Sequence, residues 1–88
     1  MTFKATETFW RRFYALPPAQ KRLAREKWEI FKVDPFDPRL GTHKINSLSA
    51  RVKKTIRSVV IDDDLRVIFV MDGDVVTTLD IGPHAIYR

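Results

Sequence analysis

Three side chains in the C-terminal third of the chain can hold a phosphate or move a proton. Arg66 interrupts the otherwise apolar run LRVIFVM, and His84 and Tyr87 lie within the last five residues. A guanidinium can grip a phosphate through two parallel hydrogen bonds, and histidine gains or loses a proton near neutral pH. A tyrosine offers a hydroxyl proton and a ring that can stack on a base. Whether these groups meet depends on the strands that carry them.

A structural role is open to the same residues. A charge inside an apolar strand is costly unless it is paired or reaches water. The three aspartates at 62–64 directly precede the strand of Arg66 and can supply that pairing. In the same way, His84 can cap a turn while Ile86 and Tyr87 pack on the edge of a sheet.

The charge of the chain is high and unevenly placed. There are 16 Lys and Arg against 11 Asp and Glu, a net charge of +5, and the pI is near 9.9. Such a protein favours polyanionic partners, namely RNA, DNA or an acidic protein. The stretch 51–58 has four cations and no acid, and a partner anion would relieve their mutual repulsion. These candidate RNA-binding residues are Arg51, Lys53, Lys54 and Arg57.

The composition excludes several classes of protein. Without cysteine there is neither a disulfide framework nor a thiolate metal site, and we expect no metal and no cofactor. No run of about 18 apolar residues could cross a membrane, and the N-terminal MTFKATETFWRR lacks the apolar stretch of a signal peptide. A length of 88 residues indicates one domain, 1–88, and the absence of cysteine suits a cytoplasmic location.

Two helices are expected in the first part of the chain. Thr6 can cap a helix over 7–16, and Pro17-Pro18 ends it and starts a second helix over 18–32. The two form a helical hairpin. Apolar residues recur at helical spacing in both, and we predict that they are core residues: Phe9, Trp10, Phe13, Leu16, Leu23, Ala24, Trp28 and Phe31.

The rest of the chain has the two-residue period of strands. A short strand at 2–5 would come first, and four more are expected at 43–48, 55–61, 65–71 and 74–81. The last two are joined by Asp72-Gly73, a strong hairpin signal. The fold class is therefore α+β: a short N-terminal strand, a two-helix hairpin, and a four-stranded antiparallel meander. The helices must cover one face of the sheet, which leaves the other face open or partly open for a site.

The order of these elements and several short motifs resemble one known group of proteins. The motifs are LGTHKI, RSVVIDDDLRVIF, the Asp-Gly hairpin and the ending TLDIGPHAIY. Together they resemble the RelE/ParE superfamily, the toxins of type II toxin–antitoxin pairs, and the RelE-like branch in particular. The resemblance covers nearly the whole chain and is most specific over 57–87.

The resemblance implies an activity and a set of partners. RelE-like members cleave mRNA on the ribosome without a metal, which inhibits translation. The 2′-hydroxyl of the RNA attacks the adjacent phosphate, so the site needs a base, an acid and cations for the developing charge. Carried over to this chain, the catalytic roles fall on Arg66, His84 and Tyr87. The implied partners are a cognate antitoxin and mRNA on the ribosome, with operator DNA reached only through the antitoxin complex, and no membrane.

Other basic positions depend on the register of the strands. Lys44 and Arg88 are further candidate RNA-binding residues. A three-residue loop at 62–64 places Val60 opposite Arg66 and sends Arg57 to the other face of the sheet, whereas a two-residue loop brings Arg57 to the same face, because a one-residue slip reverses every side chain.

The chain also departs from the RelE-like pattern. Many RelE-like members carry a second basic residue near the position of Val60, which cannot hold a phosphate. Two alternatives therefore stay open. One is a ParE-like toxin that binds DNA gyrase and cleaves nothing. The other is a non-toxic nucleic-acid-binding module that uses the aromatic residues of 9–14 beside Arg11 and Arg12.

Overall fold

A computed structural model describes residues 1–87, with the backbone alone for Val52 and Tyr87. The strands are β1 (Thr2–Ala5), β2 (His43–Lys44), β3 (Ile56–Val60), β4 (Leu65–Asp72) and β5 (Val75–Pro83). The helices are α1 (Glu7–Tyr14), α2 (Pro18–Phe31) and α3 (Asn46–Val52), with 3₁₀ turns η1 (Pro38–Leu40) and η2 (His84–Tyr87). The predicted α+β class is confirmed.

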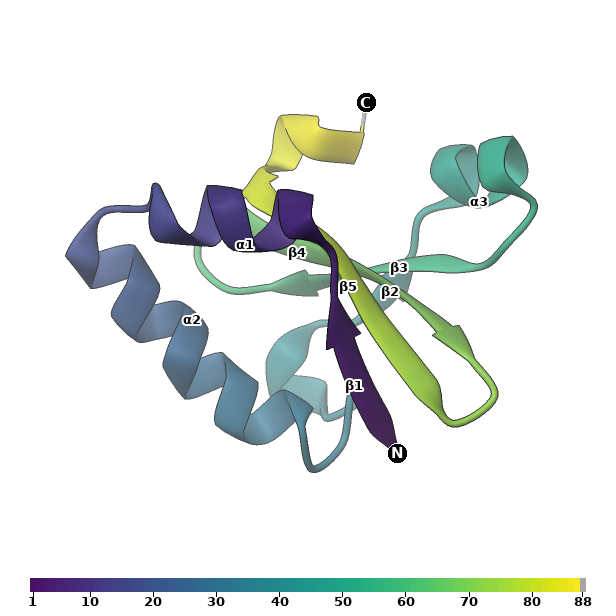
Figure 1. The fold of residues 1–88 in the computed structure, drawn as a ribbon, viewed down its shortest axis with the longest axis horizontal. Helices are drawn as coiled ribbons and strands as arrows, with labels where there is room; N and C mark the ends of the chain where they lie inside the picture. Colours follow the sequence, from purple (N-terminus) through teal and green to yellow (C-terminus); the bar gives the residue numbers. More distant parts are fainter. Residues whose placement is uncertain (88) are drawn as a thin grey trace.

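The five strands form one sheet in the order β1-β5-β4-β3-β2. The pairs β2–β3, β3–β4 and β4–β5 are antiparallel, as predicted, and β1 adds in parallel to the outer edge of β5. It pairs only with Val75–Thr78, after which the chain leaves the sheet for α1. The second half of β5 therefore has α1, not a strand, beside its outer edge (Figure 1).

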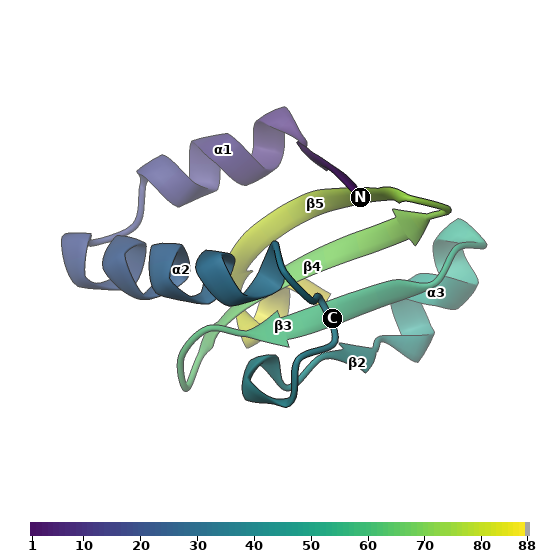
Figure 2. The ribbon, with the colours of Figure 1, turned by 90° about the horizontal axis from the view of Figure 1, so that it is seen from below.

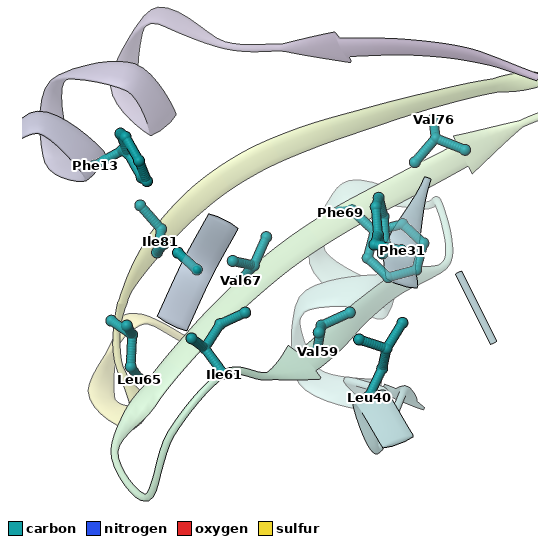
Figure 3. Packing of buried hydrophobic residues seen from close by; sticks show 11 residues of the cluster. Phe13, Phe31, Leu40, Val59, Ile61, Leu65, Val67, Phe69, Val76 and Ile81 are labelled. Carbon is teal, nitrogen blue, oxygen red and sulfur yellow. The ribbon is translucent and has the colours of Figure 1, made fainter. Parts of the chain in front are cut away.

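The two predicted helices cover the first face of the sheet. The Thr6 hydroxyl accepts a hydrogen bond from the Phe9 amide at 3.1 Å, which caps α1, and Pro18 begins α2. Together they enclose the main core against the inward side chains of β3, β4 and β5 (Figure 3). Its central residues include Phe13, Phe31, Leu40, Val59, Leu65, Val67, Phe69, Val76 and Ile81.

Two of the aromatic residues predicted to be core are not. Trp10 is 46% exposed and Trp28 is 39% exposed. Trp10 stacks on the ring of Tyr14, with the centroids 5.8 Å apart, and both residues are exposed. The helical spacing identified the apolar stripe, but the stripe is wider than the strip of α1 that faces the sheet.

The second face of the sheet is partly covered. A smaller cluster of Ile45, Ile56 and Ile68 lies there, and Leu48 of α3 and Ile86 of η2 pack against it. Seen from below, α2 lies in front of the sheet while α3 and η2 lie behind it (Figure 2). The sequence predicted helices on one face only, and this prediction is wrong, because α3 and η2 lie on the second face.

The predicted strand at 43–48 is wrong beyond its first two residues. After β2 the chain turns into α3, which places Ile45 and Leu48, three residues apart, on the same cluster. The hydroxyl of Ser49 is buried and accepts a hydrogen bond from the Ile56 amide at 2.9 Å. This contact fixes the helix against the start of β3, and the tertiary packing outweighs the alternating pattern.

Candidate functional site

Arg66 lies on β4, which has a strand on each side, and its side chain points to the second face. Its cross-strand partners are Val60 on β3 and Gly82 on β5. The guanidinium donates to the backbone carbonyls of Asp62 and Leu65, the latter at 3.2 Å. These carbonyls, rather than the carboxylates at 62–64, are what hold the half-buried cation. Backbone oxygens satisfy N–H donors without cancelling the charge, so Arg66 stays able to attract an anion.

The tail that carries His84 returns to the same end of the sheet. Pro83 pairs with Leu65, and His84 begins η2 directly after it. The backbone amide of His84 donates to the Asp64 carboxylate at 3.1 Å, which ties the tail to the β3–β4 loop. The imidazole is on an exposed residue. The structure therefore brings the strand carrying Arg66 and the residue His84 together.

We call the region formed by Arg66 on β4, Gly82 on β5 and the start of η2 the Arg66 corner. Gly82 lies at its centre, where a side chain would be in the way. A Cβ built on it would lie 2.7 Å from Cγ2 of Ile86, closer than real side chains come, and 3.5 Å from Nη1 of Arg12. The absence of a side chain at Gly82 thus lets η2 fold back over β5. It also lets the Arg12 guanidinium approach β5 at the residue paired with Arg66.

Two predicted site residues cannot be placed in full. Tyr87 ends η2, so its backbone lies on the second face with Ile86, while its side chain is outside what the structure describes. Arg88 lies outside the described residues. The roles given to both stay predictions.

The basic residues of α3 lie at the opposite end of the second face. Arg51 is in the last turn of the helix, and Lys53 ends it in the left-handed conformation with φ of 58°. Lys54 follows, and all three side chains are exposed. Strand β3 runs from this end towards Arg66, and its five residues span about 13 Å at 3.3 Å per step. A short single-stranded segment of RNA can therefore contact both ends of the second face at once.

Lys44 and Arg57 lie on the other face. They are cross-strand partners, so they share a face, and the pairing of Val60 with Arg66 shows that the loop at 62–64 has three residues. That register sends Arg57 away from Arg66, and its guanidinium lies 5.1 Å from the ring centroid of Phe36. The structure does not bring these two cations to the Arg66 corner.

Sequence reasoning gave Arg12 no part in this corner. This residue of α1 reaches past the outer edge of β5, where its Nε lies 3.3 Å from the Asp80 carboxylate. Nothing in its spacing singled it out among the arginines of an exposed helix.

A cavity of about 540 Å³ lies on the first face, between α1, α2 and the sheet. Its lining is mostly aromatic and aliphatic, with Lys4, Arg25 and Lys27 as its charged residues and no histidine or acid. It therefore offers no acid–base pair. Within residues 1–87, the His, Asp and Glu side chains form no group of three that could hold a metal ion. No helix within residues 1–87 is long and apolar enough to cross a bilayer.

Comparisons with known proteins find likeness in structure but not in sequence. No protein-family model matches the chain, and no curated protein matches it. Among solved structures, the fold matches that of a chain in the archaeal RelE–RelB complex from Pyrococcus horikoshii OT3. The TM-score is 0.73 at 17% identity, over 97% of this chain and 96% of that one.

Two further solved structures match the fold of this chain. YafQ from E. coli strain BL21(DE3) gives a TM-score of 0.71 at 16% identity, over 94% of this chain and 92% of that one. A copper-bound mutant toxin from Helicobacter pylori gives a TM-score of 0.68 at 17% identity, over 97% of this chain and 96% of that one. At such identities a match shows the architecture and leaves the chemistry to be argued from the site. The chain has the fold of the RelE-like toxins.

Proposed function

We propose that this protein is the toxin of a type II toxin–antitoxin pair and a metal-free endoribonuclease that cuts mRNA on the ribosome. The observation that carries the proposal is the corner formed by Arg66 and the η2 tail. There a guanidinium held by two carbonyls lies across from Gly82, and a single residue pair, Leu65–Pro83, separates it from the start of η2 at His84. The RelE-like fold supports the toxin class.

In this proposal each group has one task. Arg66 binds the scissile phosphate and stabilises the charge that builds on it when the 2′-oxygen attacks. His84, exposed at the rim, exchanges the proton of the attacking hydroxyl or of the leaving 5′-oxygen. Tyr87 contributes its hydroxyl or stacks on a base. The cations of α3 hold neighbouring phosphates of the same strand: Arg51, Lys53 and Lys54.

The partners follow from the same activity. An antitoxin covers the second face and keeps the RNA out, and operator DNA is bound only by the toxin–antitoxin complex. The target mRNA lies in ribosomes, so the toxin acts in the cytoplasm. All of these functions belong to the single unit 1–88.

The deciding experiment adds the purified protein to a translating bacterial extract and maps the mRNA ends by primer extension. Wild type, Arg66→Ala, His84→Ala and Arg22→Ala are compared, because Arg22 is an exposed arginine on α2, away from the second face. We expect new ends inside ribosome-occupied codons with wild type and Arg22→Ala. The two site variants should lose them while keeping the circular-dichroism spectrum of wild type. Equal cleavage by all four proteins would disprove the site.

One observation favours a second candidate. The residue across from Arg66 on β3 is Val60, an aliphatic residue that cannot contact a phosphate. A ParE-like toxin needs no nuclease site and would bind DNA gyrase instead. Intact mRNA together with inhibition of gyrase supercoiling by the same protein preparation would establish that function.

A further inference from the structure

Among the described residues of β4, β5 and η2, Arg66 is the one lysine or arginine at the Arg66 corner, and phosphate transfer calls for more positive charge. The in-line attack spreads negative charge over the non-bridging oxygens, and a single guanidinium cannot surround them. Neither cross-strand neighbour helps, since Val60 is aliphatic and Gly82 has no side chain. A second cation, if present, has to come from outside the two neighbouring strands.

Arg12 is placed to be that cation. It belongs to the last turn of α1, the helix that lies along the outer edge of β5. Its Nη1 lies 3.5 Å from the position that a Cβ of Gly82 would occupy. Gly82 and Arg66 are direct partners, so that Cβ position and the Cβ of Arg66 share the second face, about 5 Å apart.

Asp80 fixes the orientation of the Arg12 guanidinium and leaves much of it exposed. Asp80 takes the Nε side of Arg12 at 3.3 Å and also accepts the amide of Ile81 at 2.8 Å. The Asp80 side chain is only 17% exposed, whereas that of Arg12 is 49% exposed. A planar guanidinium fixed through Nε still presents its terminal N–H groups, which are the fork that grips phosphate.

We infer that Arg12 is a second phosphate-binding residue, which reaches around the β5 edge to hold the same RNA phosphate as Arg66. It supplies from α1 the charge that Val60 does not supply from β3. This inference rests on the proposed function, because the phosphate is that of the bound RNA.

The first test measures cleavage rates in the translating extract for wild type, Arg12→Gln, Arg12→Lys and Arg11→Gln. Arg11 is the adjacent exposed arginine of the same helix and makes the same change in net charge. We expect Arg12→Gln to lower the rate about 10- to 100-fold and Arg12→Lys to recover part of it, with Arg11→Gln within about twofold of wild type. Thermal unfolding verifies that each variant is folded. An Arg12→Gln rate indistinguishable from wild type, or an equal loss in Arg11→Gln, would overturn the inference.

The second test does not need cleavage. A 2′-O-methyl RNA trinucleotide, which cannot be cut, is titrated into ¹⁵N-labelled protein while the arginine Nε–Hε resonances are followed by NMR. We expect the Arg12 and Arg66 signals to shift together, with matching apparent affinities. A shift of Arg66 alone, or no shift of either, would overturn the role of Arg12.

The two tests separate the failure of the inference from that of the proposed function. If wild type cuts no mRNA, the nuclease proposal falls, and the NMR titration still decides whether Arg12 binds phosphate. If wild type cuts and Arg12→Gln cuts equally well, the nuclease stands and Arg12 is only the partner of Asp80 on β5.

Discussion

Val60 of β3 lies directly across the ladder from Arg66 of β4, so an aliphatic side chain stands where a second cation would be most useful. Val60 is only half-buried, and its Cγ2 lies 3.1 Å from the position that a Cβ of Gly41 would occupy. Because the Val60 side chain is only partly covered, a longer side chain at this position can extend to solvent. This position is a site where charge can be added beside Arg66 without opening the main core.

Val60→Lys should strengthen the nuclease. The aliphatic stem of lysine can keep the contact with Gly41 while its ammonium reaches the second face. One added charge-assisted contact to phosphate contributes about 1.5 kcal/mol, so we expect a cleavage rate about tenfold above wild type in the translating extract. Val60→Gln, which adds length without charge, should stay near wild type. A rate for Val60→Lys at or below that of Val60→Gln would show that no phosphate passes this position.

Gly82→Ala should damage the site by moving the tail. The new methyl would lie 2.7 Å from Cγ2 of Ile86, so η2 would have to shift, and His84 with it. We expect a loss of cleavage of about tenfold or more, and about 1–3 kcal/mol less stability from overpacking.

The matched control for that variant is Gly73→Ala. Gly73 has φ of 60°, so alanine there costs about 1 kcal/mol, yet a Cβ would meet nothing within 4 Å. It should therefore lose stability and keep its activity. Adding Ile86→Ala to Gly82→Ala removes the clashing methyl and should restore part of the rate. If the double variant is no better than Gly82→Ala, the tail is not what the glycine accommodates.

The residues that can be placed from sequence are those fixed by local pattern. Strand β4 and its hairpin partner β5 were predictable because an apolar run flanks Asp72-Gly73, a turn that joins antiparallel strands. The face of Arg57 was not predictable. The face depends on whether the loop at 62–64 has two or three residues, and both lengths fit the same alternating pattern.

The rest of the site depends on contacts between distant residues. Helix α3 is only seven residues long, and what stabilises it is the packing of Leu48 and the hydrogen bonds of Ser49 to β3. Arg12 meets Asp80 across most of the length of the chain, and no periodicity of α1 encodes that meeting. The positions of α3 and of the Arg12 side chain depend on how the helices and strands pack together, so the local sequence pattern does not predict them.

Binding of an antitoxin should protect the second face. Hydrogen exchange of the free protein and of its complex can be compared amide by amide. We expect slower exchange in η2 and the loop at 62–64, which lies beside the site. The amides of α2, on the first face, serve as the internal reference. Protection limited to α2 would place the antitoxin on the first face and contradict the proposed mode of inhibition.

Asp37 should titrate well below the ordinary range of a carboxylic acid. The side-chain hydrogen bond from Arg39, followed by the backbone hydrogen bond from the same residue, lowers the pKa of Asp37 from 3.8 to about 2. Because the pKa is depressed in the folded state, this pair stabilises η1 fully above pH 3.8, and the contribution is lost as the pH falls through about 2. Carboxyl ¹³C NMR should give a midpoint at about 2. In Arg39→Ala the midpoint should rise towards 3.8, and in Lys27→Ala it should move much less, since Lys27 makes the smallest contribution.

Two buried serines on the second face should respond in opposite ways to removal of the hydroxyl. The Ser49 hydroxyl accepts from the Ile56 amide at 2.9 Å, so Ser49→Ala leaves a buried N–H without its partner and should cost about 1–3 kcal/mol. Ser58 is fully buried, and its hydroxyl has no hydrogen-bond partner among residues 1–87. Ser58→Ala removes an unsatisfied polar atom and should change stability by less than about 0.5 kcal/mol, or increase it. Urea unfolding of the two variants and wild type measures the difference. If both alanines cost the same, the Ser49 hydrogen bond does not hold α3 on β3, and the Lys53 and Lys54 cations at the end of that helix lose their fixed place beside the sheet.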